Sequence, residues 1–231
     1  MIKIAGYQKT TLQDYPGHIS SIVFTQGCNF RCGYCHNPDL IPFDCEERCM
    51  DCSEIFSHLK KRSKVIEGVV ITGGEPTIQT GLLEFIEKIK GLGLKVKIDT
   101  NGSNPAMLKD ILKRGLLDYV AMDYKYPSKR YPALVNVDLS SKSILASRDI
   151  IIQSGVPHEF RVTIIESLFS EGVIEEIGRE LSKARTIVLQ GFNNTIVYDS
   201  SFRKYPKTHH NFLEHVRNIL IRYNQRVIIR D

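Results

Sequence analysis

The stretch "GVVITGGEPTIQTGLLEFIEKIKGLGLKVKIDT" (residues 68–100) carries the pattern that decides the fold of this chain. Residues 68–72 form a short run rich in β-branched side chains, which predicts a buried strand. Residues 81–93 space their apolar side chains for a helix and end at a glycine, and residues 95–100 predict a second strand. A strand, a helix and a strand in this order form a parallel pair with a right-handed crossover.

The same alternation extends along most of the 231 residues. Further strands are predicted at 20–26, 118–124, 159–164 and 186–190, and further helices at 53–62, 105–115, 140–154, 171–183 and from about Asn211. About six strand–helix units are fewer than the eight of a closed barrel. The pattern therefore predicts an α/β fold, a partial, open TIM-type (β/α)6 barrel, built as a single domain over residues 1–231.

The composition is that of an ordinary globular protein, with 42% hydrophobic and 25% charged residues. No apolar run reaches the ~20 residues of a membrane span, and the N-terminus lacks the apolar core of a signal peptide. We therefore expect a cytoplasmic protein without a membrane partner. The net charge is +5, and residues 203–231 are markedly basic. A solvated helix face explains this segment more simply than a nucleic-acid surface, so no nucleic-acid partner is expected.

All six cysteines fall within residues 28–52, and in a reducing cytoplasm such clustering favours metal ligands over disulfides. The stretch "QGCNFRCGYCHNP" (26–38) holds the first three, Cys28, Cys32 and Cys35. A cubane iron–sulfur cluster with full protein ligation takes four thiolates, so three thiolates would leave one iron open to a small-molecule ligand. The alternative is a structural zinc ion with His36 as the fourth ligand.

A second trio, Cys45, Cys49 and Cys52, repeats the same spacing within the short Cys-rich stretch 43–52. We interpret this stretch as an insertion in the domain. Three alternatives stay open for it: a second iron–sulfur cluster, a zinc site or unligated thiols. His58 follows on the next predicted helix and is available as a fourth ligand, and spacing alone does not choose between iron and zinc.

The first cysteine loop resembles the signature of radical S-adenosylmethionine (SAM) enzymes. In that superfamily three cysteines hold a [4Fe–4S] cluster, and SAM binds the fourth iron through its amino and carboxylate groups. Four stretches extend the resemblance to the glycyl-radical-enzyme activases: residues 10–42, 68–86, 97–105 and 118–125. Within this family the chain is most similar to the activating proteins of anaerobic ribonucleoside-triphosphate reductase, over most of residues 1–190. Typical members of that group lack the second cysteine trio.

The resemblance implies that Cys28, Cys32 and Cys35 are the cluster ligands. It also implies a SAM site that includes ten further residues: Tyr34, His36, Asn37, Gly73, Gly74, Glu75, Asp99, Asp123, Lys125 and Arg161. In the family the Gly-Gly-Glu segment binds the methionine end of SAM, where Glu75 accepts from the ammonium group. Tyr34 is expected against the adenine ring, with Phe192 as a further apolar contact. An ordinary turn is the alternative role of the Gly-Gly-Glu segment.

Asp99 and Asp123 end two predicted strands, and the resemblance places such carboxylates beside SAM or a monovalent cation, for which oxygen atoms are suitable ligands. Lys125 and Arg161 are expected to pair with the SAM carboxylate, because a fixed cation favours a carboxylate in a partly dry site. Helix capping and surface ion pairs are the alternative roles of these four residues. A monovalent cation is therefore a candidate cofactor beside the cluster and SAM.

The implied activity is reductive cleavage of SAM to methionine and a 5'-deoxyadenosyl radical, which takes a hydrogen atom from a glycine of a partner enzyme. The expected partner is an anaerobic ribonucleotide reductase, and a flavodoxin or ferredoxin is expected to donate the electron. One alternative is a radical SAM enzyme that acts on a small molecule, such as a deazaguanine-forming ring contraction. A second alternative is a non-enzymatic zinc-binding module.

Overall fold

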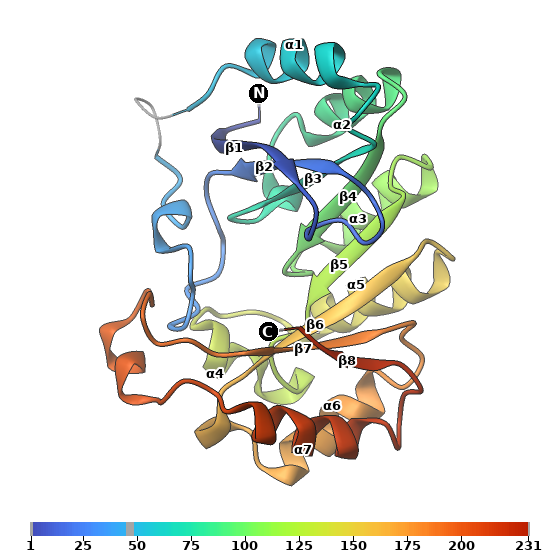
Figure 1. The fold of residues 1–231 in the computed structure, drawn as a ribbon. Coiled ribbons are helices and arrows are strands. Elements are labelled where there is room, and N and C mark those ends of the chain that lie inside the picture. Colours follow the sequence, from blue (N-terminus) through green and yellow to red (C-terminus); the bar gives the residue numbers. More distant parts are fainter. Residues whose placement is uncertain (1, 45–48, 231) are drawn as a thin grey trace. The chain divides into compact units, whose positions relative to one another are not determined.

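The computed structural model describes residues 2–44 and 49–230 (Figure 1). The chain forms two compact units, of which the first comprises Met1–Asn29 and Asp39–Val120 and the second Phe30–Pro38 and Ala121–Asp231. The strands follow the chain in sheet order, from β1 to β8. The single domain expected from the sequence stays a prediction, because this division does not test it.

The first unit contains four strands and three helices. Its antiparallel pair is β1 (Ile4–Thr11) and β2 (Ser20–Thr25), and the parallel strands β3 (Gly68–Gly73) and β4 (Lys95–Thr100) follow. Its helices are α1 (Cys52–Arg62), α2 (Leu82–Gly91) and α3 (Pro105–Lys113). The register of β2 and β3 sets Val23 beside Ile71, both fully buried. Such continuous apolar runs are typical of parallel strands that are covered on both faces.

Local chemistry fixes where these helices begin. Asp51 caps α1 by accepting from the Ser53 N–H (2.9 Å), and Asn104 caps α3 by accepting from the Met107 N–H (3.2 Å). Gly81 precedes α2 with a φ of +88°, a left-handed conformation that glycine adopts without strain. The residue that precedes each helix therefore determines where the helix begins.

The second unit continues the alternation. Strand β5 (Tyr119–Asp123) enters it from the first unit, and the parallel strands that follow are β6 (His158–Ile164), β7 (Ile187–Gly191) and β8 (Val227–Ile229). Its helices are α4 (Tyr131–Val135), α5 (Ser141–Gln153), α6 (Glu171–Glu180) and α7 (His210–Leu220). Helices α6 and α7 lie side by side (Figure 1). Short 3-10 helices occur at Pro38–Leu40, Pro76–Ile78, Ser128–Arg130, Glu166–Leu168 and Ser200–Lys204.

The six strands predicted from the sequence are confirmed as β2 to β7. Strands β1 and β8 were not predicted, because β1 has exposed polar residues at 8–10 and β8 has only three residues. The basic segment 203–231 contains α7 and β8, and α7 buries Leu213, Val216 and Leu220. Within the described ranges, no helix combines the length and apolar character needed to cross a membrane.

Candidate functional site

Cys28 belongs to the first unit and is fixed by the backbone just after β2. The Gly27 N–H donates to the Leu40 carbonyl (2.9 Å), and the Cys28 N–H donates to the Ile41 carbonyl (3.0 Å). Gly27 has a φ of +95°, and a Cβ at this position would lie 2.6 Å from the Phe43 ring. Both facts favour glycine at the position before Cys28.

Gly73 and Gly74 allow β3 to end directly against the start of the cysteine loop. A Cβ on Gly73 would lie 2.3 Å from the Thr25 nitrogen, and one on Gly74 would lie 2.1 Å from the Gly27 carbonyl oxygen. The Gly74 N–H donates to the Thr25 carbonyl (2.8 Å), and the Glu75 N–H donates to that of Gly27 (2.9 Å). The two glycines therefore have a packing role, and their predicted contact with SAM is not tested.

Glu75 is fully buried, and its carboxylate accepts four hydrogen bonds. Oε1 accepts from the Thr77 N–H (3.0 Å), the Thr77 hydroxyl (2.5 Å) and the Thr100 hydroxyl (2.7 Å), and Oε2 accepts from the Asn101 N–H (2.6 Å). Burial raises the pKa of Glu75, and these donors oppose the rise. Each carboxylate oxygen has two lone pairs, and among the described residues Oε2 accepts only the bond from Asn101, so it can accept from one more donor, such as the SAM ammonium group.

Two asparagines extend this network toward Cys28. Asn101 Nδ2 donates to Asn29 Oδ1 (3.0 Å) and lies 3.9 Å from Cys28 Sγ, and Asn29 Nδ2 donates to the Ser103 hydroxyl (2.9 Å). Neither asparagine was singled out from the sequence. The available signal was the polar pair Thr100 and Asn101 at the end of an apolar strand.

Asp99, near the end of β4, contacts a buried lysine of the same strand. Lys97 Nζ lies 2.7 Å from Asp99 Oδ1 and donates to the Asp14 carbonyl (2.7 Å). Lys97 is 1% exposed, so its ammonium group depends on these partners. The predicted place of Asp99 beside SAM or a monovalent cation stays a prediction, because its carboxylate already contacts an ammonium group.

Cys32 and Cys35 lie in the second unit, on a loop that is held by backbone hydrogen bonds. The Arg31 N–H donates to the Val135 carbonyl (2.9 Å), and the Cys35 N–H donates to the Cys32 carbonyl (3.0 Å), which closes a tight turn. Cys32 is buried and Cys35 is half-buried, and both are thiols outside any disulfide, as is Cys28.

Lys125 supplies positive charge next to these two thiols. Burial raises the pKa of Cys32 and of Cys35, and the Lys125 ammonium group opposes the rise at both. Lys125 Nζ also lies 5.7 Å from the centroid of the Tyr34 ring. Cysteines must lose their protons to bind iron, so a partly buried lysine beside them fits a cluster at this position.

Asp123, at the end of β5, holds both predicted cations of the second unit. Its Oδ1 accepts from Arg161 Nε (2.7 Å), and its Oδ2 lies 3.4 Å from Lys125 Nζ. Lys125 and Arg161 therefore form the ion pairs that were their alternative role, in a partly buried setting. Their pairing with the SAM carboxylate is not tested by these contacts.

Tyr34 provides a test of whether a cofactor fits the second unit. Its side chain is 6% exposed, and its ring lies 6.3 Å from that of Phe202. Within the part of the chain that the structure describes, the buried Tyr34 hydroxyl has no hydrogen-bond partner. A buried hydroxyl without a partner costs free energy, so this position is suited to a polar atom of a bound group.

The segment of residues 192–205, between β7 and α7, packs on the cysteine loop of the second unit. A Cβ on Gly33 would lie 2.1 Å from the Phe202 ring, and the Asp199 N–H donates to the Gly33 carbonyl (3.0 Å). The glycine between Cys32 and Cys35 is therefore required by a side chain far along the sequence. No sequence pattern indicated this contact.

His36 is held by the same segment. Its Nε2 lies 3.0 Å from the Asn193 carbonyl oxygen, and its ring stacks on that of Phe192 at 6.1 Å. Phe192 is fully buried and supports the His36 ring, and its expected contact with adenine stays a prediction. The backbone of Asn37 forms a hydrogen bond with the Cys35 thiol, and this hydrogen bond lowers the pKa of Cys35.

The structure describes two of the three cysteines in the second trio. Cys45 lies outside the described residues, Cys49 is disulfide-bonded, and Cys52 is a thiol in the first turn of α1. His58 Nδ1 lies 2.7 Å from the Tyr7 hydroxyl, so this imidazole has a partner in β1. A metal at this trio stays a prediction.

Comparison with known proteins agrees with these features. Residues 22–171 match the radical SAM superfamily. The chain therefore belongs to the radical SAM superfamily, and this membership implies a [4Fe–4S] cluster and SAM as cofactors.

One relative is similar along almost its whole length. The "Putative glycyl-radical enzyme activating enzyme MJ1227" of Methanocaldococcus jannaschii is 32% identical over 234 residues, which cover 98% of this chain and 95% of that protein. The 7-carboxy-7-deazaguanine synthase of Clostridium acetobutylicum is 30% identical over 136 residues, or 58% of this chain and 59% of that protein. The crystal structure of QueE from Escherichia coli superposes with a TM-score of 0.62 at 16% identity, covering 100% of this chain and 94% of that one. This likeness concerns the fold alone, and it confirms the predicted fold class.

Proposed function

We propose that this chain is an activase that generates a glycyl radical on a partner enzyme. The observation that carries the proposal is the similarity, over 98% of the chain, to a protein named as an activating enzyme of this kind. When bound, the [4Fe–4S] cluster and SAM would supply reductive cleavage of SAM to a 5'-deoxyadenosyl radical, which removes a hydrogen atom from the partner's glycine.

The residues of the chain would hold and orient these groups. Cys28, Cys32 and Cys35 would ligate the cluster, and Lys125 favours the thiolate form of the last two. Glu75 keeps the turn after β3 in place and has room for one more donor, which fits the ammonium group of SAM.

For the partner we propose an anaerobic ribonucleoside-triphosphate reductase, because the motifs of the chain are most similar to those of its activating proteins. A flavodoxin or ferredoxin would deliver the electron, and the reaction would take place in the cytoplasm. A monovalent cation near Asp99 or Asp123 and a metal at the second cysteine trio belong to the same proposal.

A second candidate is a radical SAM enzyme that acts on a small molecule. The match to a 7-carboxy-7-deazaguanine synthase supports it, but this match covers 58% of the chain. The activase is favoured because its match extends over nearly the whole of both proteins.

The test is an anaerobic mixture of the full chain, SAM, dithionite and the candidate reductase. We expect an electron-paramagnetic-resonance doublet from glycine, which is lost with Cys32→Ala activase and with a reductase whose radical glycine is replaced by alanine. SAM cleavage with a silent reductase would contradict the choice of partner, and a chain that cleaves no SAM would contradict the activase. Iron, sulfide and zinc counts on wild-type and Cys52→Ala protein test the second trio.

A further inference from the structure

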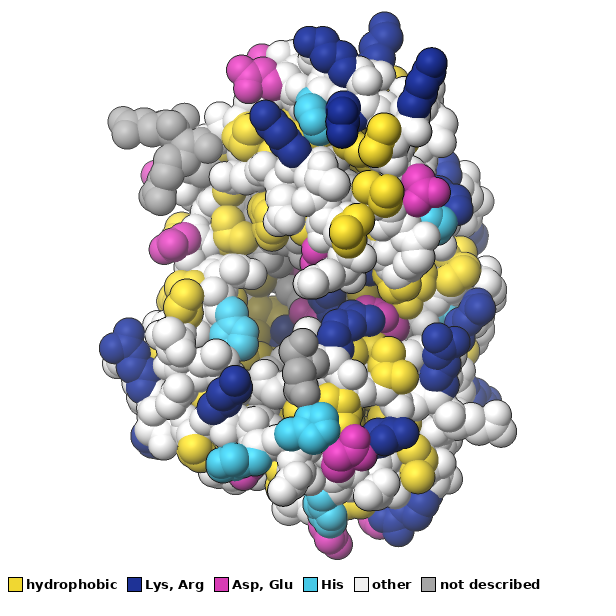
Figure 2. Space-filling view, in the orientation of Figure 1, with side chains coloured by type: hydrophobic (Ala, Val, Ile, Leu, Met, Phe, Trp, Pro, Cys, Tyr) yellow, Lys and Arg dark blue, Asp and Glu magenta, His cyan; other side chains and the backbone are white. Residues whose placement is uncertain are grey.

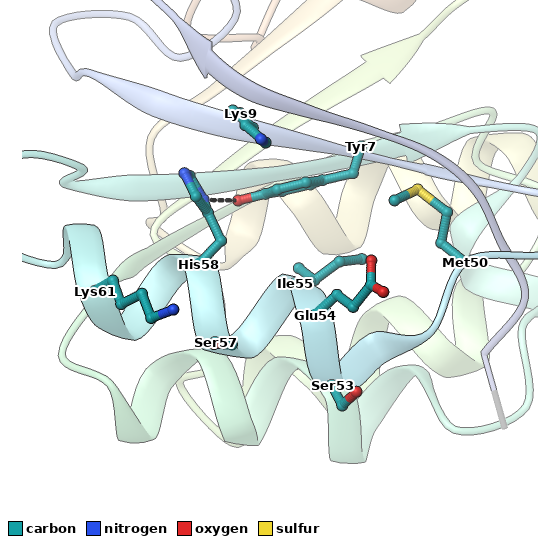
Figure 3. Close-up of a pocket in the computed structure, with 9 residues that line it drawn as sticks. All are labelled: Tyr7, Lys9, Met50, Ser53, Glu54, Ile55, Ser57, His58 and Lys61. Atoms are coloured by element: carbon teal, nitrogen blue, oxygen red, sulfur yellow. Dashed lines mark hydrogen bonds between the residues drawn. The ribbon is translucent and has the colours of Figure 1, made fainter.

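A cavity of about 500 Å³ lies between β1 and α1 in the first unit, and none of the residues assigned to the cluster or SAM lines it. Figure 3 shows Tyr7 and Lys9 from β1, Ile55, His58 and Lys61 from α1, and Met50 from the segment before α1 around it. Pockets of this size and mixed lining are typical of sites for small molecules.

The cavity is positively charged. Lys9 and Lys61 line it, and Arg62 follows Lys61 on α1. Among the residues that the structure describes, none of these three cations forms an ion pair. Figure 2 shows Lys and Arg side chains gathered around a histidine on the end of this unit that carries α1. The acidic lining residue, Glu54, is turned toward Met50 and away from His58 (Figure 3).

A chain of hydrogen bonds fixes His58 in the wall of the cavity. The Ser21 hydroxyl donates to the Lys9 carbonyl (2.8 Å), and the Tyr7 hydroxyl donates to Ser21 Oγ (3.1 Å). His58 Nδ1 lies 2.7 Å from the same Tyr7 hydroxyl, which ties the imidazole to β1. Burial lowers the pKa of His58, and Lys9, Arg62 and Lys61 lower it further. The wall is thus ordered before any ligand arrives.

We propose that this cavity binds a small organic anion, with a carboxylate or phosphate group between Lys9 and Lys61 and an apolar body against Met50 and Ile55. Within residues 2–44 and 49–230 neither ammonium group forms an ion pair, so an anion would gain charge-assisted hydrogen bonds without breaking any ion pair described there. The apolar side chains supply the remaining contact area.

The experiment is calorimetric titration of the anaerobically purified full chain with phenyl phosphate, benzoate and neutral benzyl alcohol. We expect saturable one-to-one binding of at least one of the two anions, and which of them binds assigns the head group. Replacing either lysine that lines the cavity, with Lys9→Ala or Lys61→Ala, should weaken this binding about tenfold. The matched control is Lys60→Ala, since Lys60 is an exposed lysine of the same helix that does not line the cavity, and it should bind as the wild type does.

Three results would overturn the proposal: neither anion binds, benzyl alcohol binds as tightly as the anions, or Lys60→Ala and Lys61→Ala lose the same affinity. The titrations are repeated with saturating SAM, and competition by SAM would also overturn it, because the probe would then occupy the cofactor site. The readout is binding alone, so it is independent of the proposed activase function.

Discussion

The two units hold their parts of the candidate site by different means. In the first unit a buried carboxylate gathers four donors, and glycines permit backbone contacts that a single methyl group would prevent. In the second unit the cysteine loop is held by aromatic rings and lies beside the partly buried ammonium group of Lys125. Hydrogen-bond networks fail when one member is removed, whereas apolar packing weakens in proportion to the contact that is lost. The first part should therefore be intolerant of substitution, and the second should respond gradually.

The largest effect is expected for Glu75→Ala, which leaves buried donors of Thr77, Thr100 and Asn101 without an acceptor. The two hydroxyls can rotate toward other acceptors, but each orphaned backbone N–H costs about 1–3 kcal/mol, so the free energy of unfolding should fall by about 2–6 kcal/mol. Urea unfolding of the protein measures it. The control Glu84→Ala removes a carboxylate that is 70% exposed and should change the free energy of unfolding by about 0.5 kcal/mol or less.

Gly74→Ala tests the close backbone contact in the same unit. The new Cβ would lie 2.1 Å from the Gly27 carbonyl oxygen, so the backbone must shift, at a cost of about 2–3 kcal/mol. Gly91→Ala is the matched control, because nothing lies within 4 Å of its added Cβ, and it should leave the protein equally stable or slightly more stable. Equal losses for the two variants would contradict the argument.

Phe202→Ala tests the aromatic packing of the second unit. We expect the free energy of unfolding to fall by about 2 kcal/mol, because Phe202 is only half-buried, and the cluster to lose iron faster to a chelator. Phe202→Leu should lie between the alanine variant and the wild type. Tyr198→Ala changes an exposed aromatic residue of the same segment and should behave as the wild type. If Phe202→Leu lowers the free energy of unfolding as much as Phe202→Ala does, the second unit does not respond gradually, and the proposed contrast between the units is wrong.

The smallest effect on stability is expected for Lys125→Met. This variant should instead change the pKa of the Cys32 and Cys35 thiols. Lys125 lowers the pKa of Cys32 and Cys35, so without it both thiols should ionise at higher pH. In the cluster-free protein the alkylation of these thiols by iodoacetamide should then need a more alkaline solution. The control Lys129→Met removes an exposed lysine and should leave the pH profile in place.

Much of the fold could be predicted because β2 to β7 are apolar runs separated by regular helices. Strand β1 escaped prediction, since its polar stretch at 8–10 has no alternation, and its pairing with β2 contains two register shifts. Strand β8 is short, and residues 227–229 form a strand because they pair with β7. This pairing exists only in the folded chain and leaves no pattern in the sequence.

The sequence made Cys28, Cys32 and Cys35 candidates because chemistry fixes residue type and spacing there, and their role as cluster ligands stays a prediction. Contacts between distant segments were not, because neither propensity nor spacing encodes them. Phe202 on Gly33 and Asn101 beside Cys28 are two such contacts. Residues singled out for SAM, such as Asp123 and Lys125, turned out to contact one another as well.

The contact of Phe202 with Gly33 has a consequence for biosynthesis. A nascent polypeptide exposes Cys28, Cys32 and Cys35 long before residue 202 leaves the ribosome. Until then the turn between the last two lacks its aromatic cover. Stable incorporation of the cluster should therefore be coupled to completion of translation, and truncated chains should release their iron.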